Sequence, residues 1–412
     1  MSTVAHARAG MSPATVVLTL TLLLGIQPIT TDLYLPALPT ITQAFGAPIS
    51  AAQLTLSALI ICLGFGQLAC GPLSDRFGRR PVLLGGVALY TAASVFSAVA
   101  PSIDWLIAWR ALQGLAMAAA VTCGRSLIRD LYDPLDGARV MSRALTGLGV
   151  IAGVSPLAGG FIVTWFDWRA ALLVLAVFGA LTLAFVALRF EETLVVRNVH
   201  ATRVLPMLRN WVQIASNPTF RAFAALSSAT YGGLFMLLAG SSFVYIEVLG
   251  SSPVVYGAIL SSGSLSYIVG TLLCRYLLAT RGLRGTVAVG GFFSLFGGLS
   301  MAGLALAGVH EMWAIALPQA LYAVGHGIHQ PCAQAGAVGP FPEKAGTAAS
   351  VSGFLMMLTA FAVGLWLGRS LDGTVYPLTL GVGVFGVAVA AIAWTLVQRH
   401  GEMRPVPVAQ PA

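Results

Sequence analysis

The chain has 412 residues, of which 57% are hydrophobic and only 9% are charged, and its formal net charge is +8. Soluble domains carry about 25% charged residues, so a chain this long with so little charge cannot cover a water-exposed surface. The composition excludes a soluble globular protein and predicts a polytopic membrane protein.

Apolar runs bounded by charges, Gly or Pro predict twelve membrane-spanning helices. A spanning helix needs about 20 residues, so these runs and their short connections leave no room for a sizeable soluble domain. The predicted spans are 14–38, 51–71, 81–100, 105–124, 144–164, 170–188, 222–245, 254–274, 286–308, 312–336, 345–368 and 376–397.

The basic residues predict the orientation of these spans. An even number of spans puts both termini on one side, and all Lys and Arg except Arg110, Arg169 and Arg369 fall on that side. By the positive-inside rule both termini, with the tails 1–13 and 398–412, are cytoplasmic. The net charge then serves the orientation of the spans in the membrane. It does not indicate nucleic-acid binding, which requires a soluble module with clustered basic and aromatic residues.

The first predicted span carries an aspartate in "TTDLYLPALP", residues 30–39, where Pro36 and Pro39 are expected to end the helix at the outer face. An ionised carboxylate in a membrane helix costs about 3 kcal/mol or more. Of the 14 Asp and Glu, Asp32 is the only one clearly within a span. An acid at such a position is predicted to be functional, and proton exchange is the chemistry that suits it.

The connection after the second span reads "GPLSDRFGRRPVLL", residues 71–84. Its glycines allow tight turning, and Asp75 can pair with an arginine or with a helix N-terminus. A plain positive-inside stop signal would need neither Asp75 nor both glycines. We therefore predict a gating loop on the cytoplasmic side, made by Gly71, Asp75, Arg76, Gly78, Arg79 and Arg80.

The fourth span, "RALQGLAMAAAVTCGR", begins with Arg110 about five residues inside its outer end. At 1.5 Å per residue Arg110 lies roughly 8 Å deep, which is similar to the depth expected for Asp32. Two opposite charges at matched depth are expected to share a polar cavity. The alternative is that Arg110 extends to the outer interface.

The fifth span contains "GVIAGVSPLAGG", residues 149–160. Small residues at Gly149, Gly153 and Gly160 are expected to leave a groove for another helix, and Pro156 removes one backbone hydrogen bond. Gly159 completes the pattern. Ordinary small-residue packing is the alternative interpretation of this stretch.

The longest connection, 189–221, separates two predicted six-helix bundles, 14–188 and 222–397. Two similar halves around a midplane site are typical of secondary transporters. His326 and His329 are the only histidines inside a span; they could relay protons or contact cargo, or simply bond a neighbouring helix. Candidate cavity residues, with ordinary packing as the alternative, are Tyr34, Gln113, Tyr231, Phe235, Gln319, Tyr322 and His326.

Several of these stretches resemble motifs of one family. "GPLSDRFGRR" resembles the Gly-x-x-x-Asp-Arg-x-Gly-Arg-Arg loop of the major facilitator superfamily, and "RALQG" resembles its arginine and Gln-Gly motif. "SPLAGG" resembles the antiporter motif, with Ser155 where Gly is usual. Together with "TTDLYLPALP", they are similar to the Bcr/CflA drug:proton antiporters. The resemblance implies an all-α major facilitator fold with twelve transmembrane helices in two pseudo-symmetric bundles.

The resemblance also implies a function. We expect a monomeric exporter of small amphiphilic compounds, such as lipophilic drugs, in exchange for protons, with Asp32 and Arg110 in proton coupling and with no cofactor or metal. A transporter of a sugar or amino acid, exporter or symporter, is the first alternative. A membrane-embedded enzyme would need clustered acids and histidines, and the spans hold one acid and two histidines. A channel would not need two six-span halves.

Overall fold

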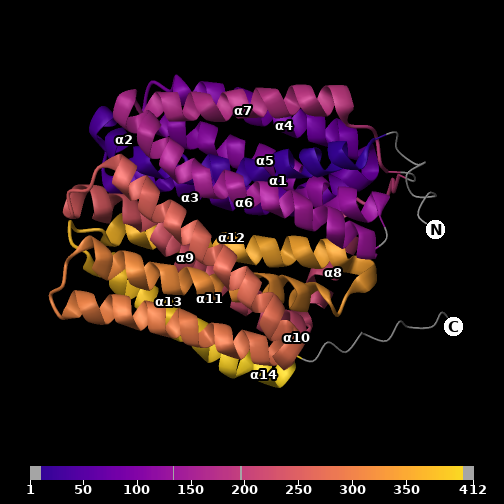
Figure 1. Cartoon of the computed structure of the whole chain (residues 1–412). Coiled ribbons are helices and arrows are strands. Elements are labelled where there is room, and N and C mark those ends of the chain that lie inside the picture. The colour runs from indigo at the N-terminus through magenta and orange to yellow at the C-terminus, as the bar shows by residue number, and fades with distance from the viewer. Residues whose placement is uncertain (1–10, 133, 195–196, 402–412) are drawn as a thin grey trace. The chain divides into compact units, whose positions relative to one another are not determined.

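The computed structural model describes residues 11–132, 134–194 and 197–401, so most of the two predicted tails lies outside the described residues. All regular elements within these ranges are helices. They form two compact units (Figure 1). The first holds the described residues up to Arg203 with Leu238–Ser264 and Gly364–Thr374, and the second holds Val204–Leu237, Leu265–Val363 and the described residues from Val375.

The first unit is built from seven long or medium helices and a short 3-10 turn. Helix α3 packs along α5, α4 lies against α5 and α7, and α1 lies against α6. A side chain at Gly114 would place its Cβ 2.0 Å from the Leu59 carbonyl oxygen, so only glycine lets α5 approach α3 this closely. The elements are α1 (Pro13–Asp32), η1 (Leu35–Ala37), α2 (Leu38–Phe45), α3 (Ile49–Phe77), α4 (Arg79–Ala98), α5 (Ile103–Leu131), α6 (Pro134–Trp165) and α7 (Trp168–Arg189).

The remaining helices belong mainly to the second unit. Helix α10 contains two of the predicted spans, and its backbone breaks at Gly282, where φ is 65°, a left-handed conformation that favours glycine. The elements are α8 (Val204–Ser216), α9 (Pro218–Ser242), the π-helix η2 (Phe243–Val248), α10 (Pro253–Leu306), α11 (Met312–Val338), η3 (Pro342–Lys344), α12 (Ala345–Ser370), α13 (Tyr376–Trp394) and α14 (Leu396–His400).

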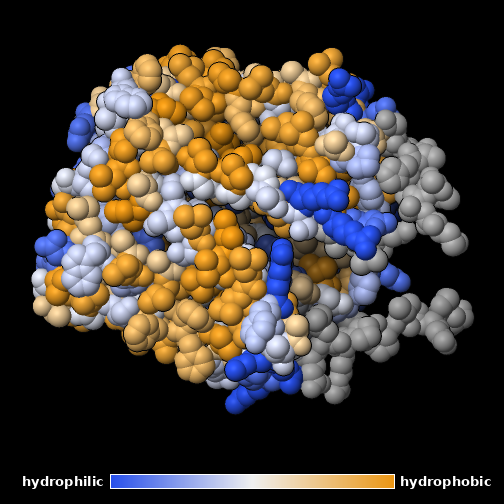
Figure 2. Space-filling view, viewed as in Figure 1, coloured by the Kyte–Doolittle hydropathy of each residue, from blue (hydrophilic) through white to orange (hydrophobic). Residues whose placement is uncertain are grey.

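Ten stretches of the described chain are long and apolar enough to cross a membrane. One of them is the double-length α10, and the predicted span 312–336 corresponds to α11, which carries two prolines and two histidines. The predicted twelve-helix membrane fold is therefore confirmed. Figure 2 shows apolar side chains over much of the visible surface. Large apolar side chains are widely exposed in the structure; Phe65 and Trp165, for example, are 54% and 71% exposed. Lipid covers such a surface, whereas water would not.

The first span continues beyond its predicted end. Helix α1 ends at Asp32, but η1 and α2 carry the apolar stretch on to Phe45. The expectation that Pro36 and Pro39 end the span is wrong, because each proline stands in the first turn of a new helical segment, where its missing N–H costs nothing. Asp32 therefore lies at a break within the span, about 20 Å along the helix axis from Phe45.

Candidate functional site

Arg110 is completely buried in the first unit, and its guanidinium points to α1. Its Nη1 donates to Gln113 Oε1 at 2.7 Å, and its Nη2 donates to the Thr30 carbonyl oxygen at 3.2 Å. The guanidinium carbon also lies 4.1 Å from the centre of the Tyr34 ring, a cation–π contact. Arg110 is 0% exposed, so the alternative that it extends to the outer interface is wrong.

A second layer of hydrogen bonds holds the partners of Arg110. Gln113 Nε2 donates to Ser94 Oγ at 2.6 Å, which ties α5 to α4. The Tyr34 hydroxyl lies 2.7 Å from Thr55 Oγ1 on α3, and the Thr30 hydroxyl lies 2.6 Å from the Tyr90 hydroxyl on α4. We call these residues and Arg110 the Arg110 network. It joins four helices of the first unit, and the sequence pattern did not predict Thr30, Ser94, Thr55 or Tyr90.

Asp32 lies beside this network and is not paired with Arg110. Its Oδ1 accepts a hydrogen bond from the neighbouring Thr31 hydroxyl at 2.7 Å, and the side chain remains half-buried. Among the described residues, the ion pairs formed within 4.0 Å involve Arg79 and Arg139, and none involves Asp32. The carboxylate interacts electrostatically with Tyr256, at the start of α10.

Within the part of the chain that the structure describes, Arg110 is therefore a buried cation without a carboxylate partner. Arg110 Nε also has no hydrogen-bond partner among the described residues. A buried charge that lacks an ionic partner destabilises a fold by several kcal/mol unless other contacts compensate. Here the Thr30 carbonyl, the Gln113 amide and the Tyr34 ring supply the compensation. Such an arrangement is typical of a functional charge.

The predicted loop at 71–80 is a sharp corner between α3 and α4. Residues up to Phe77 are helical, α4 begins at Arg79, and Gly78 alone, with φ at 107°, makes the turn. A Cβ at Gly78 would lie 2.4 Å from Glu192 Oε2, whereas Gly71 has its nearest such neighbour at 4.0 Å. The prediction of a turn that needs glycine therefore applies to Gly78.

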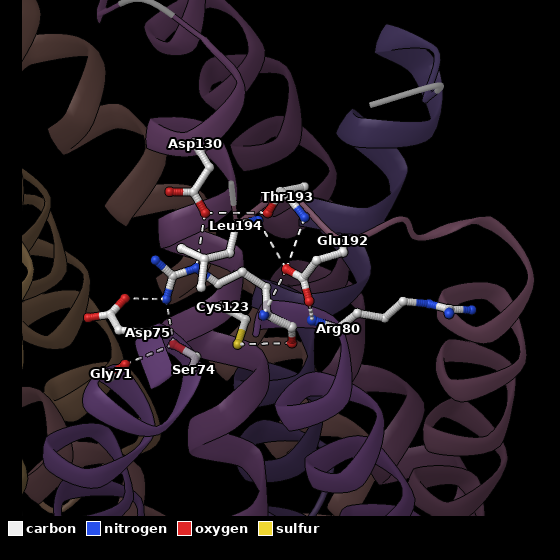
Figure 3. A network of polar contacts seen from close by, with 10 residues as sticks. Gly71, Ser74, Asp75, Arg80, Cys123, Asp130, Glu192, Thr193 and Leu194 are labelled. Atoms are coloured by element: carbon white, nitrogen blue, oxygen red, sulfur yellow. Dashed lines mark hydrogen bonds and ion pairs between the residues drawn. The ribbon is translucent and has the colours of Figure 1, made fainter. Parts of the chain in front are cut away.

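Arg79 contacts three polar side chains at this corner. Figure 3 labels these partners, Ser74, Asp75 and Asp130. Although only 3% exposed, Arg79 pairs with Asp75 at 2.7 Å and with Asp130, near the end of α5, at 3.0 Å. Its Nη1 also donates to Ser74 Oγ at 2.6 Å. The pairing of Asp75 with an arginine is thus present, and Asp130 is an additional partner that the sequence pattern did not predict.

Glu192 caps the same corner from the segment after α7. Its carboxylate accepts hydrogen bonds from the backbone N–H groups of Arg79 at 2.9 Å and Arg80 at 3.2 Å (Figure 3). A carboxylate at a helix N-terminus satisfies free N–H groups and offsets the helix dipole. Arg76 donates to the Thr202 hydroxyl at 2.6 Å. The adjacent acids Glu191 and Glu192, which follow the sixth predicted span, were a sequence signal that could have identified Glu192 as a partner of this corner.

Removal of the Arg79 side chain tests how much this corner stabilises the fold. Arg79→Ala leaves Asp130 and Asp75 without their cation, and we expect a loss of about 3 kcal/mol in unfolding free energy. Arg76→Ala, at an exposed position, is the matched control and should cost at most about 1 kcal/mol. Chemical unfolding of the purified variants in detergent measures both. Equal effects of the two substitutions would contradict the central position of Arg79.

The glycines of α6 differ in what they contact. A Cβ at Gly159 would lie 2.2 Å from the Leu33 carbonyl oxygen, and one at Gly160 would lie 2.4 Å from the Pro253 carbonyl oxygen. A Cβ at Gly153 would have no neighbour within 4 Å, so the expected groove for another helix is not found at this residue. Within the predicted motif, Gly159 therefore makes its close approach to the residue that follows Asp32.

This difference predicts opposite outcomes for two alanine substitutions. Gly159→Ala pushes α6 away from the break that holds Asp32, and we expect a cost of about 1–3 kcal/mol because backbone atoms cannot rotate aside. Gly153→Ala should be neutral, since its Cβ meets open space. Thermal unfolding of both proteins, together with transport by each, checks the prediction. A Gly159→Ala protein as stable and active as Gly153→Ala would show that this contact is unimportant.

The second unit holds a cluster of aromatic and polar residues around His326. His326 Nδ1 lies 3.1 Å from the Thr230 hydroxyl, and its ring centre lies 5.6 Å from that of Tyr267 and 6.3 Å from that of Tyr231. Tyr231 in turn stacks with Phe235 at 6.3 Å. Three of the predicted cavity residues are therefore neighbours, and Tyr267 was missed.

Other predicted polar residues of this unit are placed differently. The Tyr322 hydroxyl donates to the Thr230 carbonyl oxygen at 3.4 Å, beside the cluster. His329 Nε2 lies 3.1 Å from the Val287 carbonyl oxygen on α10, which agrees with the alternative of a histidine bonded to a neighbouring helix. Gln319 Oε1 is buried and has no partner among the described residues. Because Tyr34 and Gln113 belong to the first unit, one cavity shared by all seven residues stays a prediction.

Comparison with known proteins decides the family. A model of the Major Facilitator Superfamily matches residues 20–365. The chain belongs to the Major Facilitator Superfamily. A bicyclomycin resistance protein homolog of Haemophilus influenzae is 26% identical over 388 residues, which cover 94% of this chain and 97% of the relative. The multidrug resistance protein D of Escherichia coli is 29% identical over 350 residues, with 82% and 84% covered.

The fold comparison agrees with the family. The crystal structure of a D-xylose-proton symporter superposes with a TM-score of 0.75 at 16% identity and covers 95% of this chain and 99% of the symporter. At that identity the likeness concerns the fold alone. The chain is thus a multi-pass membrane transporter for a small molecule and not an enzyme. The names of the relatives agree with the resemblance to the Bcr/CflA antiporters.

Proposed function

We propose that the protein exports small amphiphilic compounds, such as lipophilic drugs, from the cytoplasm in exchange for protons. The observation that carries the proposal is the pair of charges in the first unit. Among the described residues, Arg110 is fully buried without a carboxylate partner, and Asp32, which forms no ion pair there, lies two residues beyond the Thr30 carbonyl that Arg110 holds. A neutral and an ionised Asp32 differ by one charge, two residues along the chain from the carbonyl that holds this cation. A proton on Asp32 therefore changes the electrostatic balance of this part of the first unit.

The break in the first span offers a way for a change in the charge of Asp32 to change the conformation of the helix. Asp32 is the last residue of α1, and η1 and α2 follow as separate helical pieces. A broken helix can change its bend with less loss of hydrogen bonding than a continuous one. We infer that protonation of Asp32 alters the α1–η1 junction and thereby the access to the site, as alternating access requires.

The energy of one proton is sufficient for substantial export. A proton moving inward yields about 2.3 kcal/mol per 100 mV of membrane potential and about 1.4 kcal/mol per pH unit. Together these sustain an approximately 500-fold gradient of a neutral compound.

The proposal includes a bacterial inner-membrane location, cytoplasmic termini and action as a monomer. These rest on the distribution of basic residues and on the family.

The aromatic cluster of the second unit supports an amphiphilic cargo. Tyr231, Phe235 and Tyr267 offer ring faces next to a single polar ring, His326. Ring faces bind apolar and cationic groups alike.

A susceptibility panel tests the proposal in a strain that lacks its own exporters, with the wild type and a vector control. Reduced drug accumulation that disappears with a protonophore supports proton-coupled drug export. Import of a sugar or amino acid would favour the metabolite alternative.

A further inference from the structure

Helix α8 exposes an apolar face outside the membrane-spanning helices. The helix is 13 residues long, and its exposed large side chains are spaced three and four residues apart, which places them on one face. They are Val204, Leu205, Leu208 and Val212, with exposed fractions of 61%, 60%, 44% and 66%. Arg209 and Gln213 are exposed beside this face. A helix with this distribution of residues is amphipathic and leaves its apolar side uncovered.

The opposite side of α8 is held by the protein. Ile214 is completely buried. Lys344, in η3, donates from Nζ to Asn210 Oδ1 at 2.9 Å and to Gln213 Oε1 at 2.8 Å. The helix is therefore fixed along one edge, and its apolar face is directed away from these contacts.

A tight corner places α8 next to the first turn of a membrane span. Only Asn217 separates α8 from α9. Its backbone N–H donates to the Ile214 carbonyl oxygen at 3.1 Å, and its Oδ1 accepts from the Phe220 N–H at 3.0 Å. The Thr219 hydroxyl donates to the His400 carbonyl oxygen at 2.8 Å, so α9 begins where the C-terminal span finishes. Helix α8 thus ends at the level where α9 begins and the C-terminal span finishes.

We propose that α8 lies in the plane of the membrane, with its apolar face inserted among the lipids of the leaflet at which α9 begins and with its basic residues on anionic headgroups. Continuity with α9 brings the apolar face to the level of the bilayer surface. Arg209 on α8 and Arg221 in the first turn of α9 are both exposed and positively charged. Apolar insertion and attraction to anionic lipid together are what hold an amphipathic helix at an interface. This inference does not depend on the nature of the cargo.

Site-directed spin labelling of the full-length chain in lipid nanodiscs tests the orientation of α8. Leu208→Cys and Gln213→Cys are labelled in a variant whose five native cysteines are replaced, and collisions with oxygen and with a water-soluble nickel chelate are measured. We expect the Leu208 label to be accessible to oxygen and protected from the chelate, and the Gln213 label to show the reverse. Equal access of the chelate to both labels would overturn the proposal. Protection of Leu208 from both reagents would also overturn it, because another protein surface would then cover the face.

Two further experiments test the proposal, one by varying the lipid composition and one with the wild-type chain. In nanodiscs with phosphatidylglycerol the Leu208 label should be better protected from the chelate than in phosphatidylcholine alone, and Arg209→Gln should reduce this difference. No dependence on anionic lipid would refute the headgroup contact. Photoactivatable lipid added to the wild-type protein should label the 204–216 peptide, and the absence of such labelling would refute insertion even if the cysteine variants fold poorly.

Discussion

Asp32→Asn is expected to abolish proton-driven export while leaving the protein folded. Asn has nearly the shape of Asp and can keep the contact with the Thr31 hydroxyl, which lies 2.7 Å from Oδ1. The Asn side chain cannot exchange a proton, so export is no longer coupled to the proton gradient. The concentration gradient of exported compound that the cell can sustain should therefore fall from about 500-fold to no gradient. The measurement is pH-driven transport of a fluorescent cationic dye in membrane vesicles.

Glu247→Gln provides the matched control, because this exposed acid stands at the end of the spanning stretch Pro218–Val248. Among the described residues, none of the hydrogen bonds of the Arg110 network involves Glu247. It should transport as the wild type does. Asp32→Glu should retain part of the activity, since the acid is kept but its position changes. Full pH-driven transport by Asp32→Asn would contradict the coupling role, whatever the control does.

Arg110→Met is expected to remove transport without destabilising the protein. The substitution deletes a fully buried cation that has no ionic partner and fills much of the same volume with an apolar side chain. Replacement of buried ionic groups by apolar ones is often neutral or stabilising by about 1–4 kcal/mol. The Thr30 carbonyl and the Gln113 amide lose a donor, which offsets part of that gain.

Thermal unfolding and dye transport measured on the same preparations separate stability from function. Arg110→Lys keeps the charge but cannot donate to Gln113 and Thr30 with the geometry of a guanidinium, so we expect it to be folded and strongly impaired. An inactive Arg110→Met protein with an unchanged or higher melting temperature supports a functional cation. A large loss of stability with transport intact would show instead that Arg110 is structural.

Much of the architecture follows from local patterns in the chain. Apolar runs locate the spans because a lipid-facing helix needs little more than length and low charge. Asp32 and Arg110 are conspicuous because ionisable residues are rare in such runs. The corner at Gly78 can be predicted from the sequence because a sharp turn between two charged helix ends favours glycine.

Contacts between distant segments could not be predicted in the same way. Glu192 and Asp130 meet Arg79 from positions 113 and 51 residues away, and no local pattern specifies such pairings. The continuation of the first span past Leu38 was missed because a proline that begins a helical segment, such as Pro39, looks the same in sequence as one that ends it. Gly153 matches a motif, but a Cβ added there would meet nothing within 4 Å, so a small residue does not by itself indicate close packing.

Proton movement driven by the cargo tests the proposed exchange most directly. Wild-type protein is reconstituted into liposomes with an acidic interior and a pH-sensitive dye inside, and a transported drug is added outside. Antiport predicts that the interior pH rises as drug enters, and that Asp32→Asn liposomes show no such rise. Drug entry without any change in interior pH, or with further acidification of the interior, would contradict proton-coupled exchange.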